Sequence, residues 1–258
     1  MARRSRIEDA GFHHIYNRGV EKRDIFIDYK DKEKFLDIVC EVSTFYDFVI
    51  HGYALMDNHY HLLLENKREN LSHGMRQINA TYAQYFNKKY ERVGHLWQDR
   101  YKSWYIFDDE YLFTLFKYIE YNPIKANVAK EIGAYPYTFI HDMLQNKLKG
   151  CMQNSFILKW CDNINELLNS LNLELSDEEQ DSIKTFQKEA IRYKSLSKKV
   201  QQKLKLKDYF SKKMSKDKRN EAIQKAIQDG FMQSEIAKHL GLTCSAVSKI
   251  VKKLKVKH

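Results

Sequence analysis

The chain has 258 residues, enough for one large domain or two small ones, and 43% of them are hydrophobic, as in ordinary globular proteins. With 9 Gly and 2 Pro it is not a low-complexity protein, and no segment approaches the roughly 20 apolar residues of a membrane span. No apolar signal core follows the basic N-terminus, so we expect a cytoplasmic protein with no membrane partner.

The net charge of +10 is concentrated at the C-terminal end. Residues 1–150 carry 22 Lys and Arg against 21 Asp and Glu, residues 151–190 carry 3 against 8, and residues 191–258 carry 19 against 5. The last segment therefore has a net charge of +14. This asymmetry favours a polyanionic partner, nucleic acid before membrane, and a solvated Lys-rich helical tail is the alternative.

The four cysteines are Cys40, Cys151, Cys161 and Cys244, and no two of them form a CxxC pair. This spacing supports neither a zinc site nor a disulfide framework. We therefore expect reduced, mostly buried thiols.

The first half of the chain alternates between strand and helix patterns. Strands are predicted at residues 12–18, 45–56 and 59–65, and a further strand at residues 97–106. Helices are predicted at residues 31–42, with Asp31 as N-cap, at residues 71–90, and from residue 108 to about Asn122. Because the strands come in closely spaced pairs, we predict an α+β domain with a mostly antiparallel sheet.

The second half reads as helical. Residues 151–205 are polar and helix-prone with irregular apolar spacing, and a compact three-helix pattern begins at Met214. We predict a main domain over residues 1–150, a helical connector over residues 151–205, and an all-α C-terminal domain over residues 206–258.

A pair of histidines alternates with a tyrosine at His59, Tyr60 and His61. Residues i and i+2 of a strand point to the same face, so the two imidazoles converge on one side. Neutral imidazole is the commonest metal ligand among side chains. Taken alone the pattern also fits two exposed or hydrogen-bonded histidines, and a metal would need a third ligand from elsewhere.

A second polar pair lies on a predicted helix, at Tyr118 and Asn122. Their i, i+4 spacing places one above the other on a single face. Pro123 disfavours the helical conformation of the preceding residue, so we expect the helix to end near Asn122. The Asn122 amide oxygen could then complete a metal site beside Tyr118, although spacing alone favours Tyr118 as a packed aromatic.

Several blocks together resemble a known family, the single-tyrosine HUH transposases, and within it the REP-associated tyrosine transposases. The blocks are ALMDNHYHLLLE (54–65), GMRQ (74–77), YFN (85–87), GHLWQDRYKS (94–103) and YIEYNP (118–123). They follow one another in the family's order and spacing, and the resemblance runs from about Arg4 to Val128. Several blocks that match together are a far more specific signal than the HxH pattern.

This resemblance implies a fold, a reaction and a set of ligands. The fold is a ferredoxin-like domain with a central antiparallel sheet, usually acting as a dimer. The reaction is cleavage of single-stranded, hairpin-forming DNA, in which Tyr118 forms a 5′-phosphotyrosine and releases a 3′-hydroxyl. Mg²⁺ or Mn²⁺ would be held by His59 and His61. Asn122 matches the family's third ligand position, often Gln in relatives, and Glu65, which shares strand parity with the histidines, is the competing ligand.

Cationic and aromatic side chains near these motifs suit a single-stranded DNA surface, on which bases stack on rings and cations hold phosphates. The candidates are Arg76, Trp97, Arg100, Tyr101 and Lys102. Core packing is an equal alternative for Trp97. Arg100 and Lys102 share the parity of one predicted strand and are the better candidates for phosphate contacts.

Residues 221–227 and then 233–253 form a helix-turn-helix pattern. Ala237 is small where two helices must approach, Gly241 allows a left-handed turn, and Thr243 can cap the second helix. The residues that would face a DNA major groove are Ser245, Ala246, Ser248 and Lys249. A structural helical hairpin is the alternative.

Three functions remain in competition. The leading one is a metal-dependent DNA-nicking and rejoining enzyme that associates with the nucleoid. The second is a non-catalytic DNA-binding regulator that keeps the transposase fold. The third is a nuclease that activates water, with a metal on Asp108, Asp109 and Glu110, although acidic residues at a helix start are more often caps.

Overall fold

The computed structural model describes residues 7–106, 109–160, 163–172, 206–210, 214–228, 231, 233–243 and 246–250, together with residues 181, 183 and 185. The chain divides into two compact units. One comprises Met1–Tyr105 with Thr114–Ala190, and the other Ile106–Phe113 with Ile191–His258.

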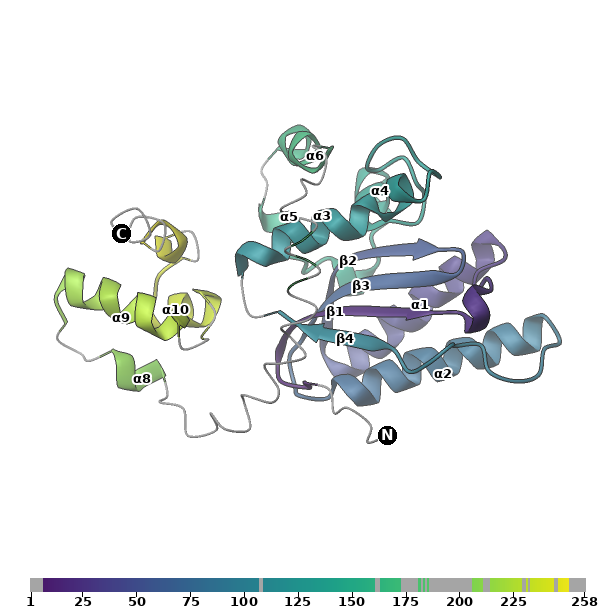
Figure 1. Ribbon diagram of the computed structural model, residues 1–258, viewed down its shortest axis with the longest axis horizontal. Coiled ribbons are helices and arrows are strands. Elements are labelled where there is room, and N and C mark those ends of the chain that lie inside the picture. Colours follow the sequence, from purple (N-terminus) through teal and green to yellow (C-terminus); the bar gives the residue numbers. More distant parts are fainter. Residues whose placement is uncertain are drawn as a thin grey trace. The chain divides into compact units, whose positions relative to one another are not determined.

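The first unit contains a four-stranded sheet in which every paired strand is antiparallel (Figure 1). Its elements follow in the order β1 (Gly11–Arg18), α1 (Tyr29–Tyr46), β2 (Phe48–Met56), β3 (His59–Asn66), α2 (Leu71–Lys89) and β4 (Lys102–Tyr105). The strands lie side by side as β2-β3-β1-β4. This β-α-β-β-α-β order is the one that characterises ferredoxin-like domains, and the predicted α+β class is confirmed.

Further helices accompany these elements. They are η1 (Val20–Lys22), α3 (Asp109–Lys125), α4 (Phe139–Leu144), η2 (Gly150–Met152), α5 (Ile157–Trp160) and α6 (Ile164–Asn172). Among the residues that the structure describes, no helix has the length and hydrophobicity needed to cross a bilayer.

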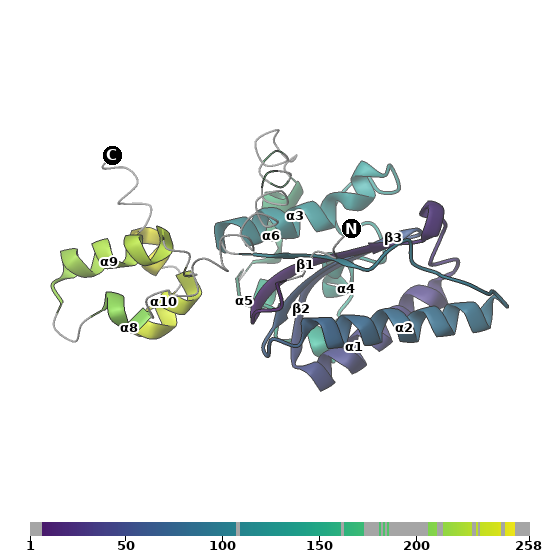
Figure 2. The same cartoon turned by 60° about the horizontal axis from the view of Figure 1, so that its bottom comes forward.

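The two faces of the sheet pack against different helices (Figure 2). Tyr60 of β3 points to α1 and α2, where its ring centroid lies 4.7 Å from that of Phe35 and its hydroxyl donates to Asn79 Oδ1 at 3.1 Å. Since neighbouring side chains of a strand point to opposite faces, His59 and His61 point to the other side. That side is covered by α3.

Helix α3 approaches the sheet closely at Gly52 of β2. A Cβ atom at this position would lie 2.8 Å from Cδ2 of Phe116, closer than real Cβ contacts permit. Glycine here therefore sets the distance between α3 and the sheet. The distance matters because Tyr118 is carried by the same helix.

Three predicted boundaries are wrong: both ends of α1 and the start of β2. Helix α1 begins at Tyr29, not at residue 31: Asp28 is the N-cap, and Asp31 is the third helical residue, whose side chain accepts from the Asp28 backbone N–H at 3.2 Å. The helix also runs on to Tyr46, so the segment from residue 45 is helical before β2 starts at Phe48. The reciprocal bonds between the two aspartates form a capping box, which accounts for the earlier start.

The fourth strand is shorter than predicted. Residues 97–101 do not join the sheet, apart from an isolated bridge between Gly19 and Trp97, and β4 covers only Lys102–Tyr105. Trp97 instead packs on Tyr60 and Tyr82 and donates its Nε1–H to the Asn79 carbonyl at 2.9 Å. Packing of the half-buried indole, not pairing in a sheet, explains the aromatic pattern of this segment.

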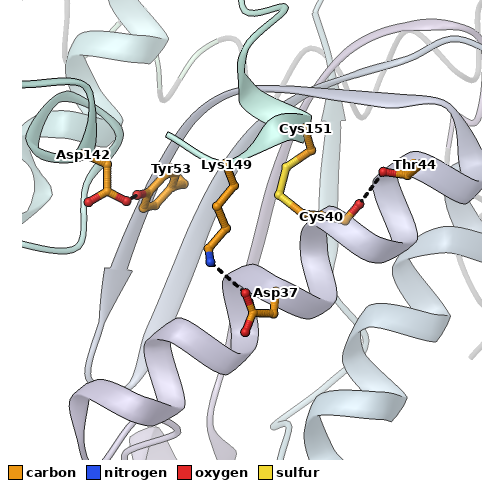
Figure 3. Close-up of a disulfide and its surroundings, with 7 residues drawn as sticks. All are labelled: Asp37, Cys40, Thr44, Tyr53, Asp142, Lys149 and Cys151. Atoms are coloured by element: carbon orange, nitrogen blue, oxygen red, sulfur yellow. Dashed lines mark hydrogen bonds and ion pairs between the residues drawn. A yellow bond between two sulfur atoms is a disulfide. The ribbon is translucent and has the colours of Figure 1, made fainter. Parts of the chain in front are cut away.

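A disulfide joins Cys40 of α1 to Cys151 of η2 (Figure 3). The expectation of reduced thiols is wrong for this pair, because the fold brings together two cysteines that are 111 residues apart. Lys149 and Asp37 form an ion pair at 2.7 Å between the same two segments. The disulfide and the ion pair together link η2 to α1. Cys161 and Cys244 lie outside the described residues.

The C-terminal unit contains α8 (Leu206–Tyr209), α9 (Lys216–Gln228), α10 (Gln233–Leu240) and a further helical segment at residues 246–250. Its small core consists of Tyr209, Ile223, Ala226, Ile236, Ala237 and Val247. Gly241 has a φ of 66°, and Thr243 Oγ1 accepts from the Ala246 backbone N–H at 3.2 Å. The predicted left-handed turn and cap between the last two helical segments are confirmed.

Candidate metal and tyrosine site

His59 and His61 lie at the start of β3, with their ring centroids 5.3 Å apart. Arg18 and Tyr16 of β1 are their partners across the strand pair. His61 is buried, at 4% exposure, whereas His59 is half-buried. The two histidines are therefore on one face, as the sequence predicts, at the edge of a buried environment.

Each imidazole uses its Nδ1 atom within the protein. His59 Nδ1 lies 2.6 Å from Asn58 Oδ1, and His61 Nδ1 lies 2.9 Å from Nε2 of His14. Both hydrogen bonds orient their rings and leave the two Nε2 atoms for other partners. Metal-binding histidines in proteins show this arrangement, with one ring nitrogen on the metal and the other hydrogen-bonded.

The surroundings keep these histidines neutral. Burial, with a smaller effect from the Arg18 guanidinium, lowers the pKa of His59 to about 4. Burial also holds the pKa of His61 well below its usual range, and the neighbouring His14 and His59 add to this. Neutral imidazoles carry the lone pair that a metal requires.

Tyr118 projects from α3 toward this face. Its ring centroid lies 5.8 Å from that of His61 and 6.2 Å from that of His14, in both cases edge to face. Burial, with a smaller effect from Tyr16, raises the pKa of Tyr118. The phenol is therefore protonated at neutral pH, and it would need nearby positive charge to act as a nucleophile.

Asn122 lies one helical turn after Tyr118, but α3 does not end there. The helix continues to Lys125 with Pro123 inside it. Pro123 has no N–H to donate to the Ile119 carbonyl, and the Asn122 Nδ2 group donates to that carbonyl at 3.3 Å and to the Tyr118 carbonyl at 2.8 Å. The side-chain amide thus replaces the missing backbone donor, which explains why the predicted helix end is wrong.

These bonds also orient the Asn122 amide. With Nδ2 turned to the helix backbone, Oδ1 is left as the free end of the group, and the described residues provide it with no hydrogen-bond donor. An amide oxygen in this state remains available as a ligand.

Glu65, the competing ligand, is occupied elsewhere. Its carboxylate lies 2.5 Å from Lys67 Nζ and 3.4 Å from Nε2 of His51. It is four residues from His61, which is about 13 Å along a strand. These partners hold Glu65 at the far end of β3.

The donor set fits a divalent ion only in part. Among the described residues, no group of three or more His, Cys, Asp or Glu side chains is placed to hold a metal. An ion on His59 and His61 would therefore take its remaining ligands from an amide oxygen, water or a DNA phosphate. Asp108 lies outside the described residues.

The DNA-contact candidates of the first unit are dispersed. Lys102 lies closest to the site, with Nζ 5.8 Å from the centroid of the Tyr16 ring, and Arg100 is exposed just before β4. Arg76 is exposed on α2, which covers the opposite face of the sheet. Tyr101 is buried at 6% exposure, so it is not displayed for stacking on a base, whereas Trp97 is half-buried with its Nε1–H bonded to the Asn79 carbonyl.

Three neighbours of the site were missed by sequence reasoning: His14, Tyr16 and Trp104. The Tyr16 ring lies 5.0 Å from His61 and 5.6 Å from His59, and the Trp104 ring stacks on His14 at 5.1 Å. His14 and Tyr16 alternate on β1 as His59 and His61 do on β3. The alternation was visible in the sequence, but the pairing of β1 with β3 was not.

In the C-terminal unit, Lys249 is exposed, and Ala246 and Ser248 are half-buried. Ser245 lies outside the described residues. Exposure of Lys249 is compatible with a contact to DNA, and the half-buried pair is compatible with either a groove or a helical packing surface.

Comparisons with known proteins agree with the geometry of the first unit. A family profile described as "Transposase IS200 like" matches residues 12–122. No curated protein sequence matches the chain.

Two solved structures are similar to part of the chain. A REP-associated tyrosine transposase bound to a REP hairpin is 17% identical with a TM-score of 0.46, and the match covers 58% of this chain and 88% of that one. A protein assigned as a transposase from Deinococcus radiodurans R1 is 12% identical with a TM-score of 0.33, and the match covers 57% of this chain and 98% of that one. Both TM-scores are too low to support a conclusion, so the family match is the finding that matters.

Proposed function

Because residues 12–122 match the profile of the IS200-like transposases, a family of DNA-cleaving enzymes with one catalytic tyrosine, we propose that Tyr118 is the nucleophile and that His59 and His61 hold a divalent metal beside it. The observation that carries the proposal is the edge-to-face placement of Tyr118 5.8 Å from His61, on the face where both histidines have Nε2 left over. The substrate would be single-stranded DNA, in keeping with the resemblance of the motifs.

In the proposed reaction, the Tyr118 oxygen attacks a backbone phosphorus. A bond forms between the phenol oxygen and phosphorus, the bond to the 3′ oxygen breaks, the phenol loses its proton and the 3′ oxygen leaves as a hydroxyl. The product is a 5′-phosphotyrosine. Because one phosphodiester bond is exchanged for another, a 3′-hydroxyl can later reverse the step and reseal a strand without ATP.

We assign the metal to His59 and His61 through Nε2, with Asn122 Oδ1 as the third protein ligand. Mg²⁺ or Mn²⁺ bound there supplies positive charge that polarises the scissile phosphate. The raised pKa of Tyr118 makes such charge necessary, since the phenol is protonated without it. The free Oδ1 of Asn122 and the engagement of Glu65 by Lys67 and His51 favour Asn122 as the ligand.

Residues on the same face would hold the strand. The exposed Lys102 side chain beside the Tyr16 ring combines a cation for phosphate with an aromatic surface for a base. Arg100 is the next candidate, whereas Arg76 could reach only a strand that wraps around the domain. Hairpin-forming DNA is the substrate class proposed from the motifs.

We propose that the C-terminal helices are a separate DNA-binding module of the helix-turn-helix type. The turn at Gly241, the cap by Thr243 and the net charge of +14 over residues 191–258 support it. Ser245, Ala246, Ser248 and Lys249 would contact the major groove. The proposed domains are residues 1–150, a connector over 151–205, and residues 206–258. DNA as substrate implies action at the nucleoid, and a homodimer is the assembly proposed from the family resemblance.

The test is detection of a covalent intermediate. Full-length protein is incubated with labelled single-stranded DNA that forms a hairpin, with Mg²⁺ or Mn²⁺, and then analysed on a denaturing gel and by peptide mass spectrometry. We expect a protein–DNA adduct whose nucleotide is attached to the peptide containing Tyr118. Cleavage that leaves a free 5′-phosphate and no adduct would instead indicate a water nucleophile.

A further inference from the structure

His14 is a third imidazole in the site, and the proposed reaction leaves it without a role. It lies on β1, is 1% exposed, and its Nε2 atom is 2.9 Å from Nδ1 of His61. The Trp104 ring contacts His14, with the centroids 5.1 Å apart. The His14 and His61 rings are nearly parallel, at an interplanar angle of 19° with their centroids 5.1 Å apart, so the hydrogen bond joins them edge to edge. This contact joins β1 to a residue proposed to bind the metal.

The hydrogen bond between the two rings has only two arrangements when both are neutral, because each then carries one N–H. In the first, His61 carries its proton on Nδ1 and donates it to His14 Nε2, which leaves the lone pair of His61 Nε2 free for a metal. In the second, His14 donates from Nε2, and the proton of His61 sits on its own Nε2, where it blocks a metal. The tautomer of His14 therefore decides whether His61 can be a ligand.

We propose that His14 is a positioning residue: it accepts the Nδ1 proton of His61 and so fixes the tautomer and ring orientation with which His61 binds the divalent metal. The inference rests on the function proposed above. It gives His14 the place that a carboxylate or a backbone carbonyl usually takes behind a metal-binding histidine.

Burial makes this role difficult to replace. His14 and His61 are 1% and 4% exposed, so bulk water does not reach the hydrogen bond between them. At the other histidine, His59 is half-buried and its Nδ1 partner, Asn58, is also only half-buried. Loss of the His14 bond should therefore weaken metal binding more than loss of the Asn58 bond.

The decisive variants separate the ring from its acceptor. His14→Phe keeps an aromatic ring against Trp104 but removes the acceptor, whereas His14→Gln removes the ring but can place an amide oxygen where Nε2 was. His13→Ala is the matched control, because His13 is also a fully buried histidine of β1 but points to the other face and bonds to Ser103 and to the Asp9 carbonyl. Mn²⁺ affinity of the full-length protein without DNA is measured by electron paramagnetic resonance, with circular dichroism to confirm folding.

We expect His14→Phe to weaken Mn²⁺ binding by about 10- to 100-fold, and His14→Gln to recover most of that loss, while His13→Ala keeps the affinity of the unchanged protein. In the metal-free protein, ¹⁵N-histidine spectra should show His61 protonated at Nδ1, and His14→Phe should abolish this preference. Unchanged Mn²⁺ affinity in a folded His14→Phe protein, or equal losses in the Phe and Gln variants, would overturn the role of His14. If the unchanged protein and His61→Ala bind Mn²⁺ equally, the metal site itself is wrong and the proposed function fails with it.

Discussion

Residues 1–150 carry 22 Lys and Arg against 21 Asp and Glu, whereas residues 191–258 carry 19 against 5. In the first segment the proposed reactive side chains are buried or half-buried, and burial keeps the histidines uncharged. In the second, basic side chains stand in solvent, among them Lys216, Lys218, Lys225, Lys238 and Lys249. The first region is thus close to neutral and the second is strongly basic.

The difference reflects what each task requires. A nucleophile and a metal must be held in one geometry, and buried hydrogen bonds such as that between His14 and His61 provide it at the expense of charge. Holding a polyanion requires many exposed cations, and their individual positions matter less than their number. We therefore expect substitutions in the first unit, which contains the sheet and is called the sheet unit below, to change the cleavage rate. Substitutions in the C-terminal unit should change the affinity for DNA.

The largest effect should follow from Tyr118→Phe. The variant keeps the ring that packs against His61 and His14 and removes only the attacking oxygen, so adduct formation and cleavage should fall to below about one thousandth of the original rate. DNA affinity should change little, because it is assigned to other residues. Cleavage rates and binding titrations on the same labelled strand measure the two effects.

Tyr121→Phe is the matched control, since it removes the hydroxyl of a half-buried tyrosine on the same helix. It should cleave normally. A cleavage defect confined to Tyr121→Phe would move the nucleophile to that residue, and parallel losses of affinity and cleavage in Tyr118→Phe would contradict the division between the two regions.

The next largest effect should follow from loss of a metal ligand. His59→Ala and His61→Ala should each lower Mn²⁺ affinity by about a hundredfold or more, and EDTA should stop cleavage, because the phosphate is then neither polarised nor positioned. Asn122→Ala should be milder, since water can take the place of an amide oxygen. Calorimetric titration with Mn²⁺ and cleavage at several Mn²⁺ concentrations measure this order. Full cleavage in EDTA would exclude the metal role.

Much of this site could be predicted from local spacing. The parity of His59 and His61 and the i, i+4 relation of Tyr118 and Asn122 are properties of one strand and one helix, and the structure places Tyr118 beside the histidines. His14 could not be found in this way, because its role depends on the register that pairs β1 with β3. The disulfide between Cys40 and Cys151 could not be predicted for the same reason, because only the tertiary structure brings together residues 111 positions apart.

The secondary structure was predictable where the spacing of apolar residues and the backbone hydrogen bonds indicate the same element, as in β1, β3 and α2. It was not predictable where a side chain replaced a backbone partner. Asp28 and Asp31 start α1 early, and Asn122 carries α3 past Pro123 by donating to the carbonyl that proline leaves free. Side-chain bonds of this kind override local propensity because they satisfy a backbone group that would otherwise be unpaired.

A moderate effect is expected from removal of the C-terminal unit. A chain ending at residue 205 retains His59, His61 and Tyr118 but loses most of the basic excess. It should still cleave a short strand at high protein concentration, whereas its affinity for longer DNA should fall. The plot of log affinity against log salt should flatten by about 0.7 to 0.9 for each DNA phosphate that the removed cations neutralise in the full-length protein.

The full-length double variant Lys238→Gln and Lys249→Gln tests the same point without truncation, because both lysines are exposed. It should flatten the salt dependence in part and leave cleavage of the short strand unchanged. Equal salt slopes in all three proteins would identify the C-terminal helices as a dimerisation or partner surface instead.

The smallest effect is expected in stability, and it would sharpen the contrast by showing that burial suppresses charge in the sheet unit. Glu120 of α3 is 1% exposed; one carboxylate oxygen accepts from the Ile140 backbone N–H at 3.3 Å, and among the described residues Oε2 has no hydrogen-bond partner. Burial raises the pKa of Glu120 to about 8.

Since the folded pKa exceeds the unfolded value of 4.5, the stabilisation from protonation of Glu120 is complete below pH 4.5 and is lost as the pH rises through 8. Glu120→Gln is neutral at every pH, so its stability relative to the unchanged protein should increase from pH 5 to pH 8, by on the order of 3 to 4 kcal/mol. Urea unfolding followed by tryptophan fluorescence measures this in the sheet unit, because all three tryptophans lie between residues 97 and 160. The exposed Glu131, changed to Gln, should show no such trend, and a flat difference for Glu120→Gln would mean that its carboxylate is already charged in the folded protein.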